Sequence, residues 1–313
     1  MPLLQINAGP DGPVVNRTQR PLGPTLQKAL QTPGPIIIML HGYKFAPGHH
    51  RGCPHRHILS LRPNPQCWKA LSWPRALGFG AGKAQEGLGI AFGWSARGTI
   101  WQAYARAASA AGQLARLITQ IRRAAPGRAV HLMAHSLGAR VALGAMRQLP
   151  GGSINRMILL NAAEYGAYAR DALESEAGRA AEIINVTSRE NDLFDFLLER
   201  LIAPPEPGDR TMAHAMPQRP NTLTIQLDHP GTLDALTRAG FAIAPRTFRF
   251  CHWSTYLRPG LFDVYRTLLR NPETLPLAQL RAALPEKPEP RWSRVLPVPD
   301  LRLALPTGQR AAS

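Results

Sequence analysis

The chain has 313 residues, of which 44% are apolar, so it is long enough to bury a sizeable core. It contains no run of eighteen apolar residues, and its start lacks the basic and then apolar segments of a secretory signal, so neither a membrane span nor export is expected. Three cysteines, Cys53, Cys67 and Cys251, suit a reducing compartment, and we expect a cytoplasmic protein.

The formal net charge is +17. Such a charge suits an anionic partner, but the arginines are scattered and form no basic run, which favours a solvated basic surface. We therefore expect no nucleic-acid partner. Peripheral contact with an anionic membrane stays open as an alternative.

Short apolar runs predict strands, and amphipathic stretches between them predict helices. The expected strands are 35–40, 87–94, 129–134, 156–163, 182–188 and 222–228, and the expected helices are 66–75, 100–124, 137–146, 166–180, 191–201 and 259–270. This alternation predicts an α/β fold, in which a mostly parallel central sheet carries helices on both faces.

The main domain is expected over 35–284, with a loop or cap-like segment at 43–86. Before it, 1–34 is a Pro- and Gly-rich lead-in that is irregular or forms short strands, and after it 285–313 is a Pro-rich tail. Sites in such sheets lie at the carboxyl ends of the strands, so the chemistry is expected just after each strand.

Ser136 is the candidate nucleophile. It lies in AHSLGAR (134–140), between an expected strand and an expected helix. A sharp strand-to-helix turn exposes the residue at its apex and needs small residues two places away on each side, which Ala134 and Gly138 provide. Ala134 departs from the Gly that usually stands first in this pattern.

From His41-Gly42-Tyr43 through GWSARG (93–98) to AHSLGAR, the chain resembles the α/β-hydrolase superfamily, and within it a little-characterised group of bacterial serine hydrolases. The resemblance covers about 35–270 and implies the α/β-hydrolase fold. It also implies an oxyanion hole made by the backbone N–H groups of Tyr43 and Leu137.

The resemblance further implies a catalytic acid and base in the order Ser, Asp, His. Asp192 follows the strand at 182–188 and is the expected acid, with Glu164 and Asp195 as alternatives. His252 precedes a C-terminal helix and is the expected base. His229 is the alternative, although His229-Pro230-Gly231 also suits a plain turn.

The segment HHRGCPHRH (49–57) is rich in metal-capable side chains, but its spacing matches no established zinc pattern. A polar loop or cap at the site entrance is the expected interpretation, so neither a metal nor a cofactor is expected.

The expected activity is hydrolysis of a carboxylic ester, on a small molecule or a lipid, through an acyl-enzyme on Ser136. An acyltransferase or peptidase with the same triad, and a catalytically idle binding protein of this fold, stay open as alternatives.

Overall fold

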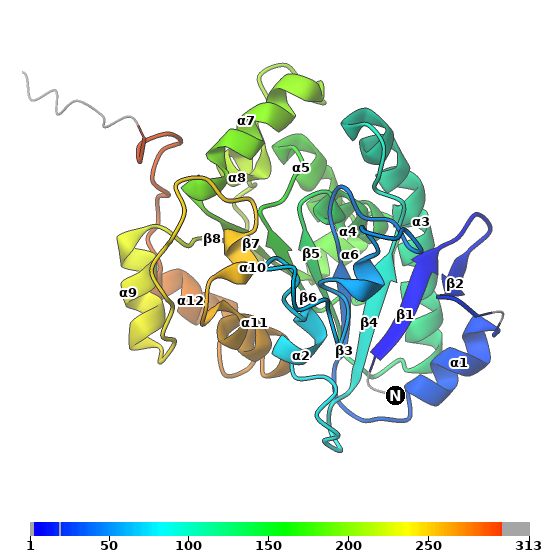
Figure 1. Ribbon diagram of the computed structural model, residues 1–313. Helices are drawn as coiled ribbons and strands as arrows, with labels where there is room; N and C mark the ends of the chain where they lie inside the picture. The colour runs from blue at the N-terminus through cyan, green and yellow to red at the C-terminus, as the bar shows by residue number, and fades with distance from the viewer. Residues whose placement is uncertain (1–2, 19, 296–313) are drawn as a thin grey trace, which may run out of the picture.

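The computed structural model of the chain describes residues 3–18 and 20–295 (Figure 1). Its centre is an eight-stranded sheet in the order β2-β1-β4-β3-β5-β6-β7-β8. The strands are β1 (Leu3–Ala8), β2 (Pro13–Val15), β3 (Ile36–Leu40), β4 (Leu88–Gly93), β5 (Val130–His135), β6 (Arg156–Leu160), β7 (Glu182–Thr187) and β8 (Thr222–Gln226). β1 and β2 pair antiparallel, and the other neighbours pair parallel, so the expected α/β fold is confirmed.

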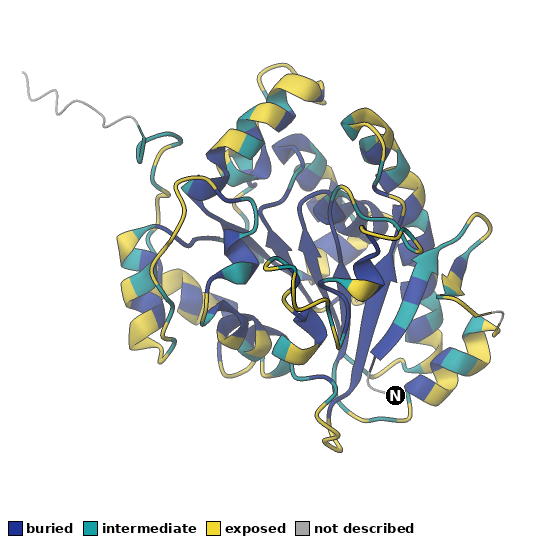
Figure 2. Ribbon diagram, viewed as in Figure 1, coloured by how far each residue is buried: buried dark blue, intermediate teal, exposed yellow. Residues whose placement is uncertain are grey.

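Both faces of the sheet are covered. Along β3, Ile36, Ile38 and Leu40 belong to one apolar core, while Ile37 and Met39 belong to the other. Side chains alternate between the faces of a strand, so a continuous apolar run is what a strand buried on both faces requires. In Figure 2 the central strands are accordingly buried, and the exposed residues lie on loops and on the outer sides of the helices.

The helices divide between the two cores. The first core takes residues from α1 (Leu22–Ala29), α3 (Ile100–Ala124), α4 (Gly138–Met146), α5 (Gly166–Glu174), α6 (Glu176–Ala180) and α8 (Met212–Ala215). The second takes residues from α2 (Trp73–Ala76), α9 (Pro230–Arg238), α10 (Ser254–Leu257), α11 (Leu261–Arg270) and α12 (Leu277–Ala283). α7 (Asp192–Leu201) stands at the top of the view in Figure 1 and packs through Leu198 on a small third cluster.

Local chemistry explains several helix limits. α3 has the expected bounds, and its start is fixed by a capping box in which Thr99 and Gln102 each bond the other's backbone N–H. The helix expected at 166–180 divides at Ser175, which ends α5 and caps α6. The helix expected at 66–75 is wrong in extent, because only Trp73–Ala76 is helical.

The N-terminal lead-in is more regular than its composition indicates. Two short strands join the sheet there, and α1 packs on the first core. At the other end, residues 285–295 have no helix or strand, but Arg291 pairs with Glu199 and the N–H of Trp292 donates to Asp192, so this stretch lies on α7. The rest of the expected tail lies outside the described residues.

No helix in 3–18 or 20–295 combines the length and apolar character that crossing a bilayer requires.

Candidate active site

Ser136 sits at a tight turn between β5 and α4 with a backbone φ of +55°. A non-glycine residue in this left-handed region is strained and must be held there by its surroundings. Its N–H donates to the carbonyl of Leu160, and its own carbonyl accepts from Ala139 and Ala163. The turn therefore has the geometry that a strand-to-helix nucleophile elbow requires.

Two glycines allow the chain to pass close to this turn. A Cβ added at Gly138 would lie 2.7 Å from the carbonyl oxygen of His41, and one at Gly42 would lie 2.6 Å from the Cβ of Ser136. Ala134, the departure from the usual motif, is fully buried in β5 opposite Leu40, where its methyl group is accommodated. The close contact between the loop after β3 and Ser136 thus depends on Gly42 and Gly138.

The expected oxyanion donors lie at this contact. Within the described residues, neither the N–H of Tyr43 nor that of Leu137 donates to a protein acceptor. The preceding peptide is fixed by His41, whose Nδ1 bonds the carbonyl of Gly42 at 2.9 Å. In a trans peptide the N–H points opposite to the carbonyl, so this bond turns the Tyr43 N–H away from the His41 ring.

The His41 ring is a neutral anchor. Nδ1 must carry the proton, because the Gly42 carbonyl can only accept, and Nε2 then accepts the N–H of Trp94 at 3.0 Å. Burial lowers the pKa of His41 to about 3, so the ring stays neutral near pH 7.

His252 lies beside the nucleophile turn. Its ring is 4.6 Å from that of His135, the residue before Ser136, and stacks on Phe194 at 4.8 Å. Its carbonyl accepts bonds from Asn161 Nδ2 and His135 Nε2, which come from the ends of β6 and β5. In the described residues no hydrogen bond joins the hydroxyl of Ser136 to the His252 ring. The structure therefore places the His252 ring beside the residue that precedes Ser136 and shows no direct bond to the Ser136 hydroxyl.

The partner of His252 is Asn191, at 2.6 Å between Nδ1 and Oδ1. An amide oxygen accepts, so Nδ1 carries the proton and Nε2 is left with its lone pair. Burial, then His135 and Lys69, holds the pKa of His252 well below its usual value. The ring is therefore a neutral acceptor near pH 7.

Asp192, the expected acid, follows β7 as predicted but has a partner other than His252. Asn191 ends the short 3₁₀ turn η2 (Arg189–Asn191), and Asp192 begins α7, so the two side chains diverge by the rotation between successive helical residues. Asp192 accepts from the N–H of Trp292 at 2.8 Å, and the residue beside His252 is Asn191.

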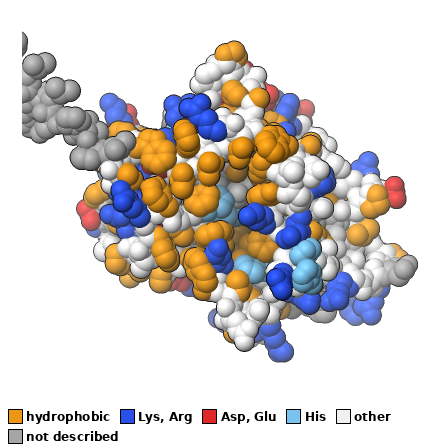
Figure 3. Space-filling view, turned by 45° about the horizontal axis from the view of Figure 1, so that its top comes forward, with side chains coloured by type: hydrophobic (Ala, Val, Ile, Leu, Met, Phe, Trp, Pro, Cys, Tyr) orange, Lys and Arg blue, Asp and Glu red, His pale blue; other side chains and the backbone are white. Residues whose placement is uncertain are grey.

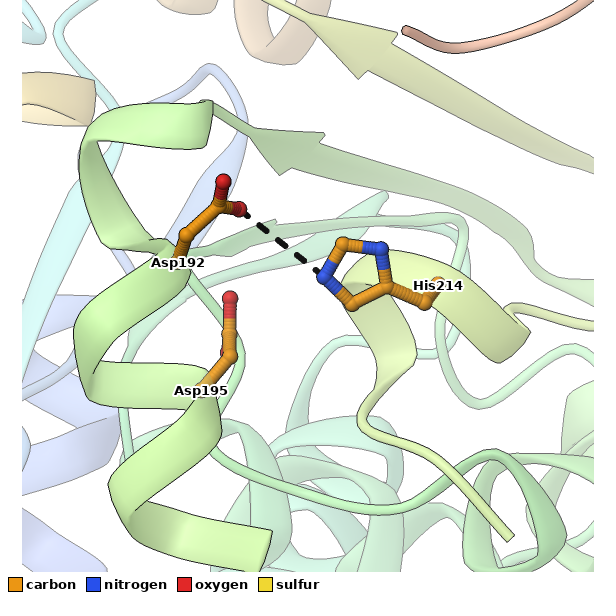
Figure 4. A group of neighbouring side chains, drawn as sticks. All are labelled: Asp192, Asp195 and His214. Atoms are coloured by element: carbon orange, nitrogen blue, oxygen red, sulfur yellow. Dashed lines mark ion pairs between the residues drawn. The ribbon is translucent and has the colours of Figure 1, made fainter. Parts of the chain in front are cut away.

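Asp192, Asp195 and His214 form a cluster in which Asp192 and Asp195 come from α7 and His214 from α8 (Figure 4). Desolvation by burial raises the pKa of Asp195 to about 8, and one of its carboxylate oxygens has no hydrogen-bond partner among the described residues. Burial lowers the pKa of His214 to about 4, so its 4.0 Å contact with Asp192 is not an ion pair near pH 7.

These three are the one group of metal-capable side chains that converges within the described residues. Arg291 already supplies a cation there, since its Nε donates to His214 Nε2 at 2.9 Å and its other nitrogens pair with Glu199. That nitrogen of His214 is the atom a metal ion would need, so the cluster suits the guanidinium better than a second cation.

The other candidates have separate partners. Glu164 is fully buried and bonds the Tyr104 hydroxyl at 2.7 Å and the Arg140 guanidinium, so it anchors α4 to α3. His229 caps α9, with Nδ1 accepting from the N–H of Gly231 at 3.0 Å. His229-Pro230-Gly231 thus begins a helix instead of forming a plain turn.

The histidines of 49–57 point to different neighbours. His49 accepts from the N–H of Gly52, His55 bonds Asn7 at 2.6 Å, and His57 contacts Cys67 Sγ at 3.2 Å. The three cysteines are free. The segment forms a loop tied to β1 and to residue 67.

Asn191, His135 and Asn161 were missed from the sequence. The superfamily pattern has a carboxylate beside the base, so its residue types do not point to Asn191. His135 and Asn161 follow the common signal of a polar residue at the carboxyl end of a strand, which alone does not separate supporting from reacting residues.

The family described as "Alpha/beta hydrolase of unknown function (DUF900)" matches residues 25–161, which include the loop after β3 and the Ser136 turn. The match covers less than half of the chain, and the mostly parallel eight-stranded sheet is that of an α/β-hydrolase fold. The matched part of the chain ends just after β6, so it does not reach Asn191 or His252.

Two solved structures of phospholipase PlaB from Legionella pneumophila are similar to part of this chain. The one in complex with thio-NAD is 15% identical with a TM-score of 0.26, over 52% of this chain and 40% of that chain. The other is 13% identical with a TM-score of 0.26, over 52% and 41%. Among curated proteins no similar sequence was found.

Proposed function

We propose that this α/β hydrolase is a serine hydrolase that cleaves carboxylic esters through an acyl-enzyme on Ser136, with His252 as base and Asn191 as its orienting partner. The observation that carries the proposal is the positive φ of Ser136, held against Gly42 beside two backbone N–H groups that have no protein acceptor among the described residues. Strain of this kind gathers where a side chain must be aimed at a substrate.

In the proposed reaction, the Ser136 oxygen attacks the ester carbonyl carbon while Nε2 of His252 takes the hydroxyl proton. The negative oxygen of the tetrahedral intermediate accepts from the N–H groups of Tyr43 and Leu137, and α4 adds the favourable end of its dipole. The C–O bond then breaks, and the leaving alcohol takes the proton from His252. Water repeats the cycle on the acyl group and releases the acid.

Asn191 replaces the carboxylate of the usual triad, as in enzymes with a Cys-His-Asn arrangement. It fixes the tautomer that leaves Nε2 free to accept a proton, but it adds no negative charge to stabilise the imidazolium. We therefore assign it an orienting role.

The test is stopped-flow hydrolysis of p-nitrophenyl esters of increasing acyl length. We expect a burst of nitrophenol with an amplitude close to one per protein, followed by slower turnover. Ser136→Ala should abolish the burst at every acyl length. Glu164→Gln is unsuitable as a control, because the native Glu164 carboxylate joins α3 to α4. Asp263→Asn, on the exposed side of α11, is a suitable control.

A catalytically idle binding protein is the second candidate. It is favoured by the missing Ser136–His252 hydrogen bond and by the neutral Asn191 beside the base. Absence of a burst across the whole ester series, with an intact melting transition, would favour this candidate.

A further inference from the structure

The described residues include nine large apolar side chains that are exposed, and eight of them lie on four segments. We call these eight the apolar rim: Trp68, Leu71, Trp101, Leu193, Leu197, Leu201, Phe248 and Phe250. The ninth, Val14, lies on the edge strand β2. Soluble proteins expose single apolar side chains freely, but a gathered set marks an interaction surface.

Aromatic contacts join the rim to the candidate active site. Trp68 lies 5.8 Å from Phe248 and 6.0 Å from Trp253, between ring centroids. Trp253 follows His252 in the chain and lies 6.3 Å from Phe194 of α7. Phe194 in turn stacks on His252.

α7 supplies the rest of the rim. Leu193, Leu197 and Leu201 recur every four residues, so they form one exposed stripe along this helix. The Trp101 indole, at the start of α3, donates to the carbonyl of Leu201 and continues the stripe. The same helix begins beside Asn191, so the stripe starts within one turn of the residue that orients His252.

The loops around the rim contain basic side chains but no acidic ones. The chain has no Asp or Glu between Glu86 and Glu164, between Asp11 and Glu86, or between Asp234 and Asp263, so the loops at 43–75, 94–101 and 239–260 carry none. In Figure 3, apolar side chains surround a hollow that contains histidines. Lysines and arginines lie among these apolar side chains, and acidic side chains lie toward the margins.

Cations lie against the rim itself. Lys69 Nζ is 3.2 Å from the centroid of the Trp253 ring, and Arg249 lies 5.9 Å from that of Phe250. On α7, Asp192 and Asp195 are buried, and Glu199 pairs with Arg291 and Arg210. No uncompensated acidic side chain of α7 therefore faces the stripe.

We propose that the apolar rim docks this protein on the surface of a bilayer that contains anionic lipids, so that the candidate active site opens toward lipid esters. The rim would enter the headgroup region while the surrounding lysines and arginines contact the anionic headgroups. The docking surface stands on its own observations, whereas the assignment of lipid esters as substrates rests on the proposed function.

The experiment is vesicle flotation of the full chain. Vesicles of equal parts phosphatidylcholine and phosphatidylglycerol should carry the protein upward, and vesicles of phosphatidylcholine alone should carry much less. Leu193→Gln/Leu197→Gln/Leu201→Gln should weaken partitioning by at least ~10-fold, because three leucines no longer leave water for lipid. Raised salt should weaken binding of the wild type as well.

Val14→Gln is the matched control, since Val14 is 46% exposed and Leu197 43%, and it should bind as the wild type does. Melting curves check that each variant is folded. Equal binding by the triple variant and the wild type would overturn the proposal, as would binding that ignores lipid charge. A stable dimer of the wild type in solution that is absent in the triple variant would also overturn the proposal, because a second copy of the chain would then cover the rim.

Ser136→Ala is floated beside the wild type. We expect equal binding, because the rim contains no reacting atom. Failure of docking would thus appear in flotation, and failure of the proposed chemistry would appear only in the ester burst.

Discussion

The two halves of the candidate site are built by different means. The nucleophile half, from β3 to the start of α4, is held by backbone against backbone, with Gly42 and Gly138 at contacts where a Cβ would clash. The base half, from η2 to α10, is held by side chains that reach across the molecule, such as Asn191 to His252 and Asn161 to the His252 carbonyl.

This difference determines what a substitution can do. A backbone contact leaves no room for even one methyl group, so a change there disturbs the geometry of the nucleophile directly. In a side-chain contact one residue can be replaced by another of similar shape. The base half can therefore have Asn191 where the superfamily pattern has Asp.

Gly42→Ala should give the largest effect. Its Cβ would lie 2.6 Å from Ser136 Cβ and 2.9 Å from the His135 carbonyl oxygen, so either the loop or the Ser136 turn must move. We expect kcat/KM for a p-nitrophenyl ester to fall by ~100-fold or more, because displaced oxyanion donors and nucleophile lose their alignment.

Gly127→Ala is the control for this change, because a Cβ there meets no atom within 4 Å. Equal, wild-type activity in both variants would show that the nucleophile half is not as tightly built as we infer.

Asn191→Ala compared with Asp192→Asn tests the base half. Removing the Asn191 oxygen frees the His252 ring to turn and to change tautomer, so kcat/KM should fall by ~100-fold. Asp192 contacts Trp292 instead, so Asp192→Asn should change kcat/KM by no more than about threefold. A large loss of kcat/KM in Asp192→Asn and a small loss in Asn191→Ala would instead indicate that Asp192 is the acid.

Asn191→Asp sharpens the same point through pH. The pKa of His252 is held well below its usual value by burial, so the wild-type acid limb of kcat/KM should lie below pH 6.5. A carboxylate beside Nδ1 favours the charged ring and should move that limb upward by about one pH unit. Identical pH–rate profiles would contradict the contact between residue 191 and His252.

The smallest effect is expected on stability. Burial raises the pKa of Asp195 to about 8, so between about pH 4 and pH 8 the unfolded state releases a proton that the folded state keeps. This carboxyl therefore lowers the free energy of unfolding as pH rises through that window. Asp195→Asn should remove that part of the slope, up to about 1.4 kcal/mol for each pH unit in urea titrations.

Asp263→Asn is the control for stability, because Asp263 is exposed on α11. An Asp195→Asn variant whose pH slope matches that of the wild type would argue against a protonated, buried Asp195.

The same contrast explains what the sequence could predict. The parallel strands and the Ser136 turn follow from local patterns, because a buried strand needs an apolar run and a tight turn needs small neighbours. The sequence does not predict that Asn191 and not Asp192 contacts His252, because the direction of each side chain depends on where η2 ends and α7 begins. β1 and β2 were also indistinct, since a short edge pair gains its stability from the sheet it joins.

The central claim is that Ser136 is an activated nucleophile. Its most direct test is incubation with a fluorophosphonate probe, followed by mass spectrometry of the peptide that contains residues 134–140. Our account predicts one adduct on Ser136 in the wild type, no adduct in Ser136→Ala, and strongly slowed labelling in His252→Ala. An unlabelled wild type that shows a normal melting transition, or undiminished labelling of Ser136→Ala, would contradict it.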